Sequence, residues 1–266
     1  MRFYLFFSFL IFSLSTVSVA QNIPGLTFGG DKNEQGFSFS ITNDNGYILT
    51  GSTKSFGSGS RDIYLVKIDA FGFVEWSGTY GIIYQDHGMW VEQTSDNGYI
   101  ITGYRWGWGL GREDVILLKT DQYGNEAWLK NYGGNHRDQG FCVKVLQDGF
   151  VVAGHSKSVD PKGDMYVFKT DFHGNELWSS SFGTEYIDYG YSIIPAEDGH
   201  FLVVGAMAGF YNVELTAFKR PDADMLLVKL NETGGVVWQK TYGGASHDWG
   251  WSIINAPDGG YYCFGS

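Results

Sequence analysis

Five carboxylates recur at equivalent places along the chain, each two residues before a glycine. Carboxylate oxygens are preferred Ca²⁺ ligands, so a ring of such groups around one axis could hold a calcium ion, the only cofactor that the sequence suggests. A structural role is the alternative, in which each side chain accepts hydrogen bonds from nearby backbone N–H groups. The series consists of Glu34, Asp86, Asp138, Asp188 and Asp248.

Aromatic residues in two loops form a second candidate site. Trp106 and Trp108 follow Arg105 in a glycine-rich segment, and Phe210 and Tyr211 lie in a later loop. Exposed aromatic rings beside arginine suit stacking on sugar rings or the grip of a protein partner. Alternatively, these rings cover the ends of the neighbouring strands.

Motifs for catalysis, phosphate binding and metal binding were also sought in the sequence. The sequence has no nucleophile motif, phosphate-binding loop or zinc-ligand spacing, and we therefore assign no catalytic residue. The net charge of -11 argues against binding to nucleic acid or anionic lipid. Cys142 and Cys263 lie at different places in the pattern described next, and we expect two buried thiols without a disulfide.

The frame Lys-x-Asp-x-x-Gly-x-x-x-Trp occurs four times, with tryptophans 52, 50 and 60 residues apart and Asn in the last Asp position. We expect a turn in which Asp accepts backbone N–H groups two or three residues on and Gly has a positive φ. Trp would pack between neighbouring units and donate its N–H to a backbone carbonyl. Lys would lay its stem on apolar surface with its charge at the rim. The motif positions are Asp69, Gly72, Trp76, Asp121, Gly124, Trp128, Asp171, Gly174, Trp178, Asn231, Gly234 and Trp238.

One unit of this pattern predicts four antiparallel strands. An acidic-x-Gly step opens a first strand such as 37–41, an Asn-Gly or Asp-Gly turn leads to a second such as 47–51, and a loop leads to a third such as 115–118. The third strand is apolar on both faces, as expected for a strand covered on both sides. The tryptophan lies on the fourth. We therefore predict an all-β chain built as a β-propeller of four-stranded blades.

The predicted organisation has a signal peptide over residues 1–20, followed by propeller repeats over 21–266. Arg2, an apolar run over 3–14 and Ser18-Val19-Ala20 fit a cleaved secretory signal, so we expect a secreted or cell-surface protein with no membrane span in the mature chain. The fifth unit is half present, and we expect the chain to be a fragment of a larger propeller. The approximate units are 28–80, 81–132, 133–182, 183–242 and 243–266.

The frame Asp-x-x-Gly-x-x-x-Trp followed by an aromatic-Gly-Gly step, as at Tyr132-Gly133-Gly134, resembles the tryptophan-docking motif of quinoprotein-type (PQQ-like) β-propeller repeats. The resemblance covers residues 26–266 and implies a propeller fold. Quinone-binding members of that family use a vicinal cysteine pair and a calcium site beside the cofactor. This chain has no adjacent cysteines, so we expect no quinone-dependent dehydrogenase activity.

Length variation is concentrated in the loop between the second and third strands. The distance from the glycine that ends the second strand to the aspartate that begins the third is 11, 11, 10 and 19 residues in the four units. Variable loops on a constant scaffold commonly carry function. The leading expectation is therefore a non-enzymatic module that binds a glycan or protein through these loops. The alternatives are a polysaccharide hydrolase or lyase using the axial carboxylates, a degenerate quinoprotein, or a structural spacer.

Overall fold

The computed structural model describes residues 27–107, 113–159, 161–196, 198–208 and 223–266, and these residues form antiparallel sheets. Four sheets have four strands each, named sheets 1 to 4 here, and a two-stranded hairpin, named hairpin 5, follows them. The strands of sheets 1 and 2 are β1 (Glu34–Ile41), β2 (Tyr47–Thr53), β3 (Asp62–Ile68), β4 (Val74–Tyr80), β5 (Asp86–Gln93), β6 (Tyr99–Trp106), β7 (Glu113–Thr120) and β8 (Glu126–Tyr132).

Sheets 3 and 4 and hairpin 5 repeat this order of strands. The predicted all-β fold class is confirmed, and the arrangement is consistent with the blades of a β-propeller. The remaining strands are β9 (Asp138–Val145), β10 (Phe150–Ser156), β11 (Asp164–Thr170), β12 (Glu176–Phe182), β13 (Ile187–Pro195), β14 (Phe201–Ala208), β15 (Asp224–Leu230), β16 (Val236–Tyr242), β17 (Gly250–Asn255) and β18 (Tyr261–Gly265).

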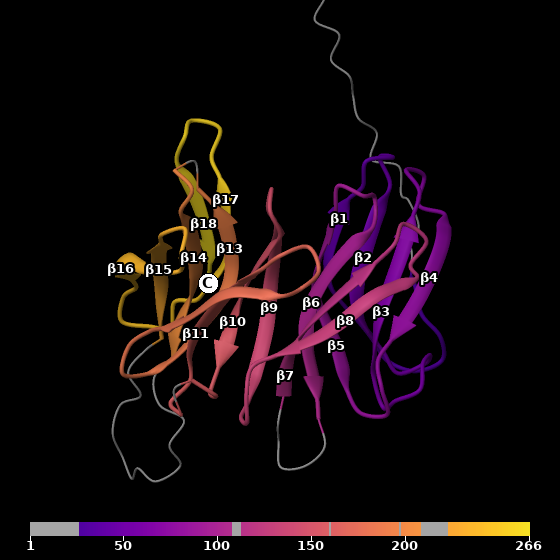
Figure 1. Cartoon of the computed structure of the whole chain (residues 1–266), viewed down its shortest axis with the longest axis horizontal. Helices are drawn as coiled ribbons and strands as arrows, with labels where there is room; N and C mark the ends of the chain where they lie inside the picture. Colours follow the sequence, from indigo (N-terminus) through magenta and orange to yellow (C-terminus); the bar gives the residue numbers. More distant parts are fainter. Residues whose placement is uncertain (1–26, 108–112, 160, 197, 209–222) are drawn as a thin grey trace, which may run out of the picture.

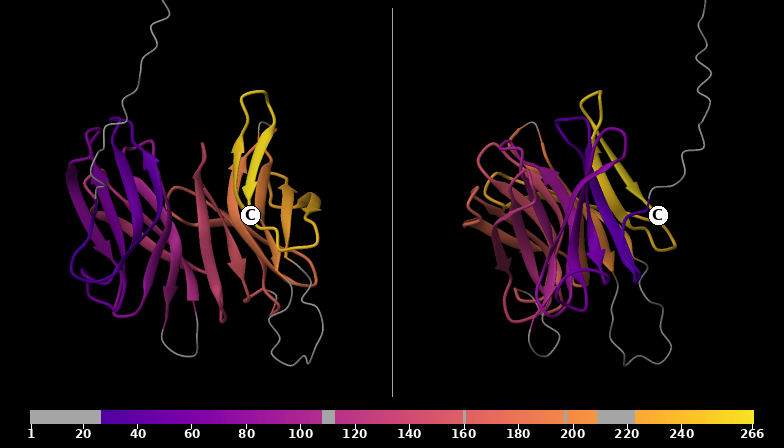
Figure 2. Two further views of the ribbon diagram at one scale, coloured as in Figure 1. Left: turned by 180° about the vertical axis from the view of Figure 1, so that it is seen from behind. Right: turned by 90° about the vertical axis from the view of Figure 1, so that its right-hand side faces the viewer.

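The sheets stand side by side in chain order and form an arc, with sheet 1 at one end and sheet 4 with hairpin 5 at the other (Figures 1 and 2). The first strand of each sheet lies at the sheet edge and contacts the first strand of the next, from β1 through β5, β9 and β13 to β17. These five strands are called the inner strands below. Their side chains are therefore brought together from segments about one repeat apart in the sequence.

The hydrophobic core lies between consecutive sheets. Ile63 and Leu65 of β3 pack with Ile101 of β6 and Ile116 of β7, and similar clusters join the later sheets. All four side chains are fully buried, because the middle strands are covered on both faces. This confirms the interpretation of the doubly apolar third strand.

The repeated motif forms the turn between the third and fourth strands. The carboxylate of Asp121 accepts the N–H groups of Tyr123 and Asn125 at 2.8 and 2.9 Å, two and four residues on rather than two or three. Gly124 has a φ of +83°, which confirms the predicted left-handed position. The same bonds recur at Asp69, Asp171 and Asn231, and the same positive φ at Gly72, Gly174 and Gly234.

Each of the first three motif tryptophans lies against the motif glycine of the next sheet. A Cβ on Gly174 would come within 2.9 Å of the Trp128 ring, so this position has room for glycine alone. The predicted bond from the indole N–H to a carbonyl is wrong for Trp178, whose Nε1 is buried without an acceptor among the described residues. In the preceding contact, between sheets 2 and 3, the Tyr132 hydroxyl donates to the Gly174 carbonyl at 2.7 Å, whereas Phe182 occupies the equivalent position in the sheet of Trp178.

Two of the four motif lysines, Lys67 and Lys119, are buried rather than extended to the rim. Lys67 is buried, and its ammonium group lies between Asp44 and Glu75 at 2.8 and 2.7 Å. Because Asp44 belongs to the hairpin turn between β1 and β2, the ion pair ties that turn to β3. The equivalent pairs are Lys119–Asp96, Lys169–Asp148 and Lys229–Asp198.

Both cysteines are free thiols. Cys142 is fully buried in β9, and Cys263 is partly buried in β18. Burial raises the pKa of the Cys142 thiol to about 11, so it stays protonated at neutral pH. Among the described residues, no helix reaches the length and apolar character needed to cross a membrane.

Candidate functional site

The carboxylates of the acidic-x-Gly steps act as hydrogen-bond acceptors for the connections between sheets. Asp138 is fully buried in β9 and accepts the N–H of Gly134 at 2.9 Å and the hydroxyl of Ser158 at 2.6 Å. In every repeat the carboxylate accepts the backbone N–H four residues before it. The other pairs are Gly30–Glu34, Ile82–Asp86, Thr184–Asp188 and Gly244–Asp248.

Burial changes the acidity of two members of this series. It raises the pKa of Asp188 to about 6, against the opposing effect of its bonds from Thr184. Burial also raises the pKa of Asp86, although Arg105 donates its Nε–H to the carboxylate. Both oxygens of Asp86 and of Asp188 accept hydrogen bonds from their own chain, whereas Oδ1 of Asp138 is buried without a donor among the described residues. Within the described part of the chain, no three His, Cys, Asp or Glu side chains converge as a metal ion would require.

The aromatic-loop residues fall into two groups. Trp108, Phe210 and Tyr211 lie outside the described residues. Trp106 ends β6 with 39% of its side chain exposed, whereas Arg105 is engaged in the ion pair with the buried Asp86. Of the two members of this group that the structure describes, Trp106 is thus the one whose ring is available to a ligand.

In every inner strand, a β-bulge follows the glycine of the acidic-x-Gly step and changes the direction of one side chain. In β13, for example, Gly190 and Ser192 pair with consecutive residues of β14, so Tyr191 is an extra residue without a partner. The inserted residue is large and apolar in all five inner strands. These residues are Phe37, Met89, Phe141, Tyr191 and Trp251.

Rings from three inner strands meet at these bulges. The Tyr191 ring lies 5.2 Å from the Phe141 ring and 4.8 Å from the Trp251 ring, measured between centroids. The residue before the glycine adds a parallel ring in two strands: Tyr189 stacks on Tyr191 at 5.7 Å, and Trp249 on Trp251 at 5.5 Å. We call these five residues the inner aromatic surface.

One ring of the inner aromatic surface is largely exposed to solvent. Trp251 is 49% exposed, and its indole N–H donates to the Ser266 hydroxyl at 3.0 Å, which fixes the ring plane. Burial raises the pKa of Tyr191, with a further contribution from Tyr189, so its phenol stays neutral over the physiological range. The surface therefore offers flat neutral rings held in fixed orientations.

One buried histidine, His87, belongs to an inner strand, and another, His155, lies beside one. His155 of β10 stacks on Tyr189 at 4.5 Å, and its Nδ1–H donates to the Asp188 carbonyl at 3.0 Å. In sheet 2, His87 stacks on Tyr104 at 4.7 Å. Burial lowers the pKa of both histidines to about 4, so both are neutral at pH 7.

Polar groups replace the aromatic pairs in the inner strands of the first and third sheets. Arg61 donates to the Gln35 amide oxygen at 2.5 Å. Glu113, which is almost fully buried, accepts bonds from Arg137 at 2.8 Å and from Gln139. Because Gln35 and Gln139 occupy the position of Tyr189 and Trp249, amide and charged groups line the same side of the inner strands as the rings.

Sequence reasoning missed the inner aromatic surface, although a signal was present. A large apolar residue follows the glycine of the acidic-x-Gly step in all five repeats, and tyrosine or tryptophan precedes it in the last two. The expected strand began at this glycine, so Tyr191 and Trp251 were assigned to ordinary strand positions. The structure begins β9 two residues earlier, at Asp138, and places the bulge within the strand.

Comparisons with known proteins support the fold. No family model matches the chain, and no curated protein matches its sequence. Among solved structures, an α-L-arabinanase of Penicillium chrysogenum, complexed with arabinobiose, is 9% identical with a TM-score of 0.57, over 85% of this chain and 72% of that chain. At this identity the likeness shows the all-β fold and no more.

Two further solved structures match with lower TM-scores. A protein of unknown function from Bacteroides caccae is 12% identical with a TM-score of 0.49, over 81% of this chain and 70% of that one. A tail fibre of Staphylococcus aureus phage P68 is 15% identical with a TM-score of 0.41, over 87% of this chain and 46% of the fibre. We draw no functional conclusion from either.

Proposed function

We propose that this protein is a non-enzymatic saccharide-binding module, and that sugar rings stack on the inner aromatic surface. The observation that carries the proposal is the pair of parallel stacks, Tyr189 on Tyr191 and Trp249 on Trp251, on adjacent inner strands. The apolar faces of sugar rings bind flat aromatic faces, and the fixed ring planes lower the entropy lost on binding. Trp251 offers the most exposed face of this set.

An extended, neutral oligosaccharide fits the surface best. Rings from β9, β13 and β17 follow one another, so consecutive sugar units would meet consecutive strands. The net charge of -11 disfavours anionic glycans at long range. The Arg137 side chain is 47% exposed, so its guanidinium group supplies hydrogen-bond donors suited to sugar hydroxyls beside the rings.

A glycan array tests the proposal with three forms of the protein. We expect wild type to bind neutral oligosaccharides, Trp251→Ala to lose most of the signal, and Trp106→Ala to keep it. Trp106 is the matched control because it is also a partly exposed tryptophan, at the end of β6. Binding that is lost with Trp106→Ala and kept with Trp251→Ala would move the site to the loop between β6 and β7.

An enzymatic role lacks a specific supporting observation. Asp188, whose pKa burial raises to about 6, occupies a repeated position and is bonded to Thr184. Glu113 is unrepeated, yet Arg137 and Gln139 hold its carboxylate. Turnover of a polysaccharide by wild type, and its loss on Asp138→Asn, would favour the hydrolase or lyase instead.

Two further proposals concern the class of the repeats and the export of the protein. We propose that the repeats belong to the tryptophan-docking, PQQ-like class, on the grounds that Trp76, Trp128 and Trp178 lie against glycines of the following sheet. We also propose export of the protein, for which the support is the signal-peptide pattern over residues 1–20. An N-terminus at Gln21 in protein purified from the culture medium is the expected result.

A further inference from the structure

A second pair of parallel rings lies on sheet 2, beyond the inner aromatic surface. His87 of β5 and Tyr104 of β6 stack at 4.7 Å between centroids, with an angle of 19° between their planes. The two residues are direct partners in the register of β5 and β6. His87 is buried, whereas Tyr104 is half-buried, so solvent reaches the tyrosine. Sheet 2 thus offers a further flat ring beside the inner strands.

Tyr104 does not belong to the repeated scaffold. It follows the glycine that ends the second strand, and this position carries a different kind of side chain in the other repeats. A side chain that varies on a constant scaffold is more often tied to function than one that the packing requires in every repeat. The equivalent residues are Ser52, His155, Ala206 and Ser266.

An arginine lies between the rings of sheet 2 and those of the later sheets. Arg137 directly precedes β9, and its side chain is 47% exposed although its Nε–H is donated to Glu113 at 2.8 Å. Burial and the Glu113 carboxylate raise the pKa of Tyr104, against the opposing charge of Arg137, so both charged groups lie near this ring. Gln139 also donates to Glu113, and it occupies the position of Tyr189.

Planar groups continue from Gln139 to the inner aromatic surface. Gln139 is the direct partner of His155 across β9 and β10, and His155 stacks on Tyr189 at 4.5 Å. Tyr189 in turn stacks on Tyr191. Flat rings at both ends of this row are therefore joined by hydrogen-bonding groups. Such an alternation suits a chain of sugar rings, whose apolar faces are separated by hydroxyl groups.

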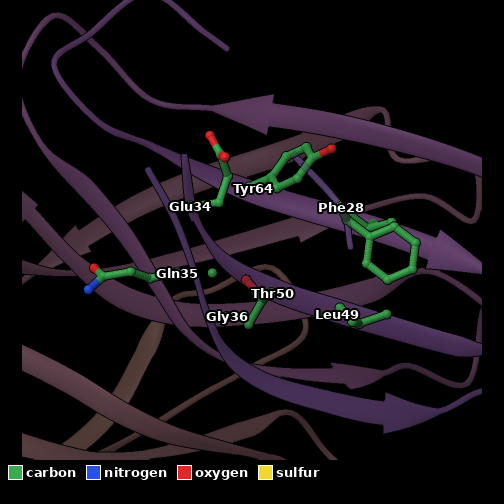
Figure 3. Close-up of a pocket in the computed structure, with 9 residues that line it drawn as sticks. Phe28, Glu34, Gln35, Gly36, Leu49, Thr50 and Tyr64 are labelled. Carbon is green, nitrogen blue, oxygen red and sulfur yellow. The ribbon is translucent and has the colours of Figure 1, made fainter. Parts of the chain in front are cut away.

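Sheet 1 ends the row of planar groups. At the two equivalent positions it carries Gln35 and Ser52, which accept hydrogen bonds from Arg61 at 2.5 and 2.9 Å. Figure 3 shows the Gln35 side chain directed away from the Tyr64 ring of the neighbouring pocket. Sheet 1 thus places no ring at this point, and a ligand that follows the row meets its last ring at Tyr104.

We propose that the ligand is a long, linear chain of uncharged sugar units, which continues past the inner aromatic surface to sheet 2 and stacks a further unit on Tyr104. Arg137 donates to the hydroxyl groups between the two sets of rings. Its charge is already paired with Glu113, which suits a neutral ligand. This inference rests on the proposed saccharide site and specifies the ligand as a polysaccharide rather than a short oligosaccharide.

Isothermal titration calorimetry with linear oligosaccharides of increasing length tests the proposal, using the neutral sugar that binds best on the glycan array. We expect the affinity to rise in two stages, first as the ligand covers the inner aromatic surface and again when it reaches Tyr104. The second rise should be about fivefold, as for one stacked ring. An affinity that stays constant after the first stage overturns the long-chain proposal and leaves the saccharide site standing. Absence of binding at every length overturns both.

Tyr104→Ala should weaken binding of the longest oligosaccharide about fivefold and leave the shortest one unaffected, whereas Trp251→Ala should weaken both. A purely structural role of Tyr104 would alter both lengths alike. Tyr104→Phe keeps the ring and should bind as wild type does. Tyr123→Ala is the matched control, because it removes a tyrosine that is 69% exposed in the turn between β7 and β8. Equal affinity of Tyr104→Ala and wild type for the longest oligosaccharide overturns the proposal.

Discussion

Trp76 of sheet 1 lies against Gly124 of sheet 2, at a distance of 2.8 Å from the place where a side-chain Cβ would stand on that glycine. The Tyr80 hydroxyl donates to the carbonyl of the same residue. This contact joins the end of one repeat to the turn of the next. It explains why Trp and Gly recur together in the sequence.

Gly124→Ala should therefore destabilise the protein by about 3 kcal/mol, of which about 1 kcal/mol arises from the positive φ and the rest from displacement of the Trp76 ring. Gly199→Ala is the matched control, because Gly199 also has a positive φ of +77° but has nothing within 4 Å of an added Cβ. Urea unfolding measures both. Equal decreases in the free energy of unfolding of the two variants would contradict the role of the tryptophan contact.

Tyr132→Phe should cost about 1 kcal/mol, because it removes the hydroxyl that donates to the Gly174 carbonyl and keeps the ring that stacks on Phe168. Phe182 occupies the equivalent position in sheet 3, so the fold tolerates the ring without its hydroxyl. The change in the urea midpoint is the measurement. Tyr123→Phe, at a residue that is 69% exposed, should leave the midpoint unchanged.

The buried histidines predict a loss of stability in mild acid. Burial lowers the pKa of His155 to about 4, below its ordinary value of 6.5. The unfolded chain therefore binds more protons than the folded one between these values. The stabilising effect of the neutral imidazole is complete above pH 6.5 and is lost as the pH falls towards 4.

Between pH 7 and pH 5, His155 should account for about 2 kcal/mol of the decrease in unfolding free energy. His155→Phe keeps a ring at this buried position and cannot take up a proton, so its decrease should be smaller by that amount. Denaturant unfolding of both proteins at the two pH values gives the difference. Identical pH dependences would show that His155 is not the group responsible.

Local turn chemistry made the fold predictable from the sequence. Asp121 and Gly124 form a turn through their own backbone and side-chain geometry, and the Asp-Gly and Asn-Gly hairpins do the same. Four copies of one pattern then fix the order of strands. The buried third strand was equally visible, because apolar residues on both faces require cover on both sides.

Features that depend on packing across neighbouring sheets were not predictable in this way. The bulge at Tyr191 and the stack of Trp249 on Trp251 depend on the pairing of two strands and on the meeting of separate repeats. The Lys67–Asp44 ion pair joins β3 to the turn between β1 and β2, so motif spacing alone indicated a charge at the rim. Side-chain direction and interactions across the fold thus limited the prediction of the site.

The central claim is that the inner aromatic surface binds saccharide. It is tested most directly by isothermal titration calorimetry with the neutral oligosaccharide that binds best on the glycan array. Loss of one stacking ring typically costs about 1 to 2 kcal/mol, so Trp251→Ala should weaken binding about tenfold, while Trp106→Ala should bind as wild type does. Tyr191→Ala should also weaken binding. An unchanged affinity of Trp251→Ala would contradict the assignment of the inner aromatic surface as the saccharide site.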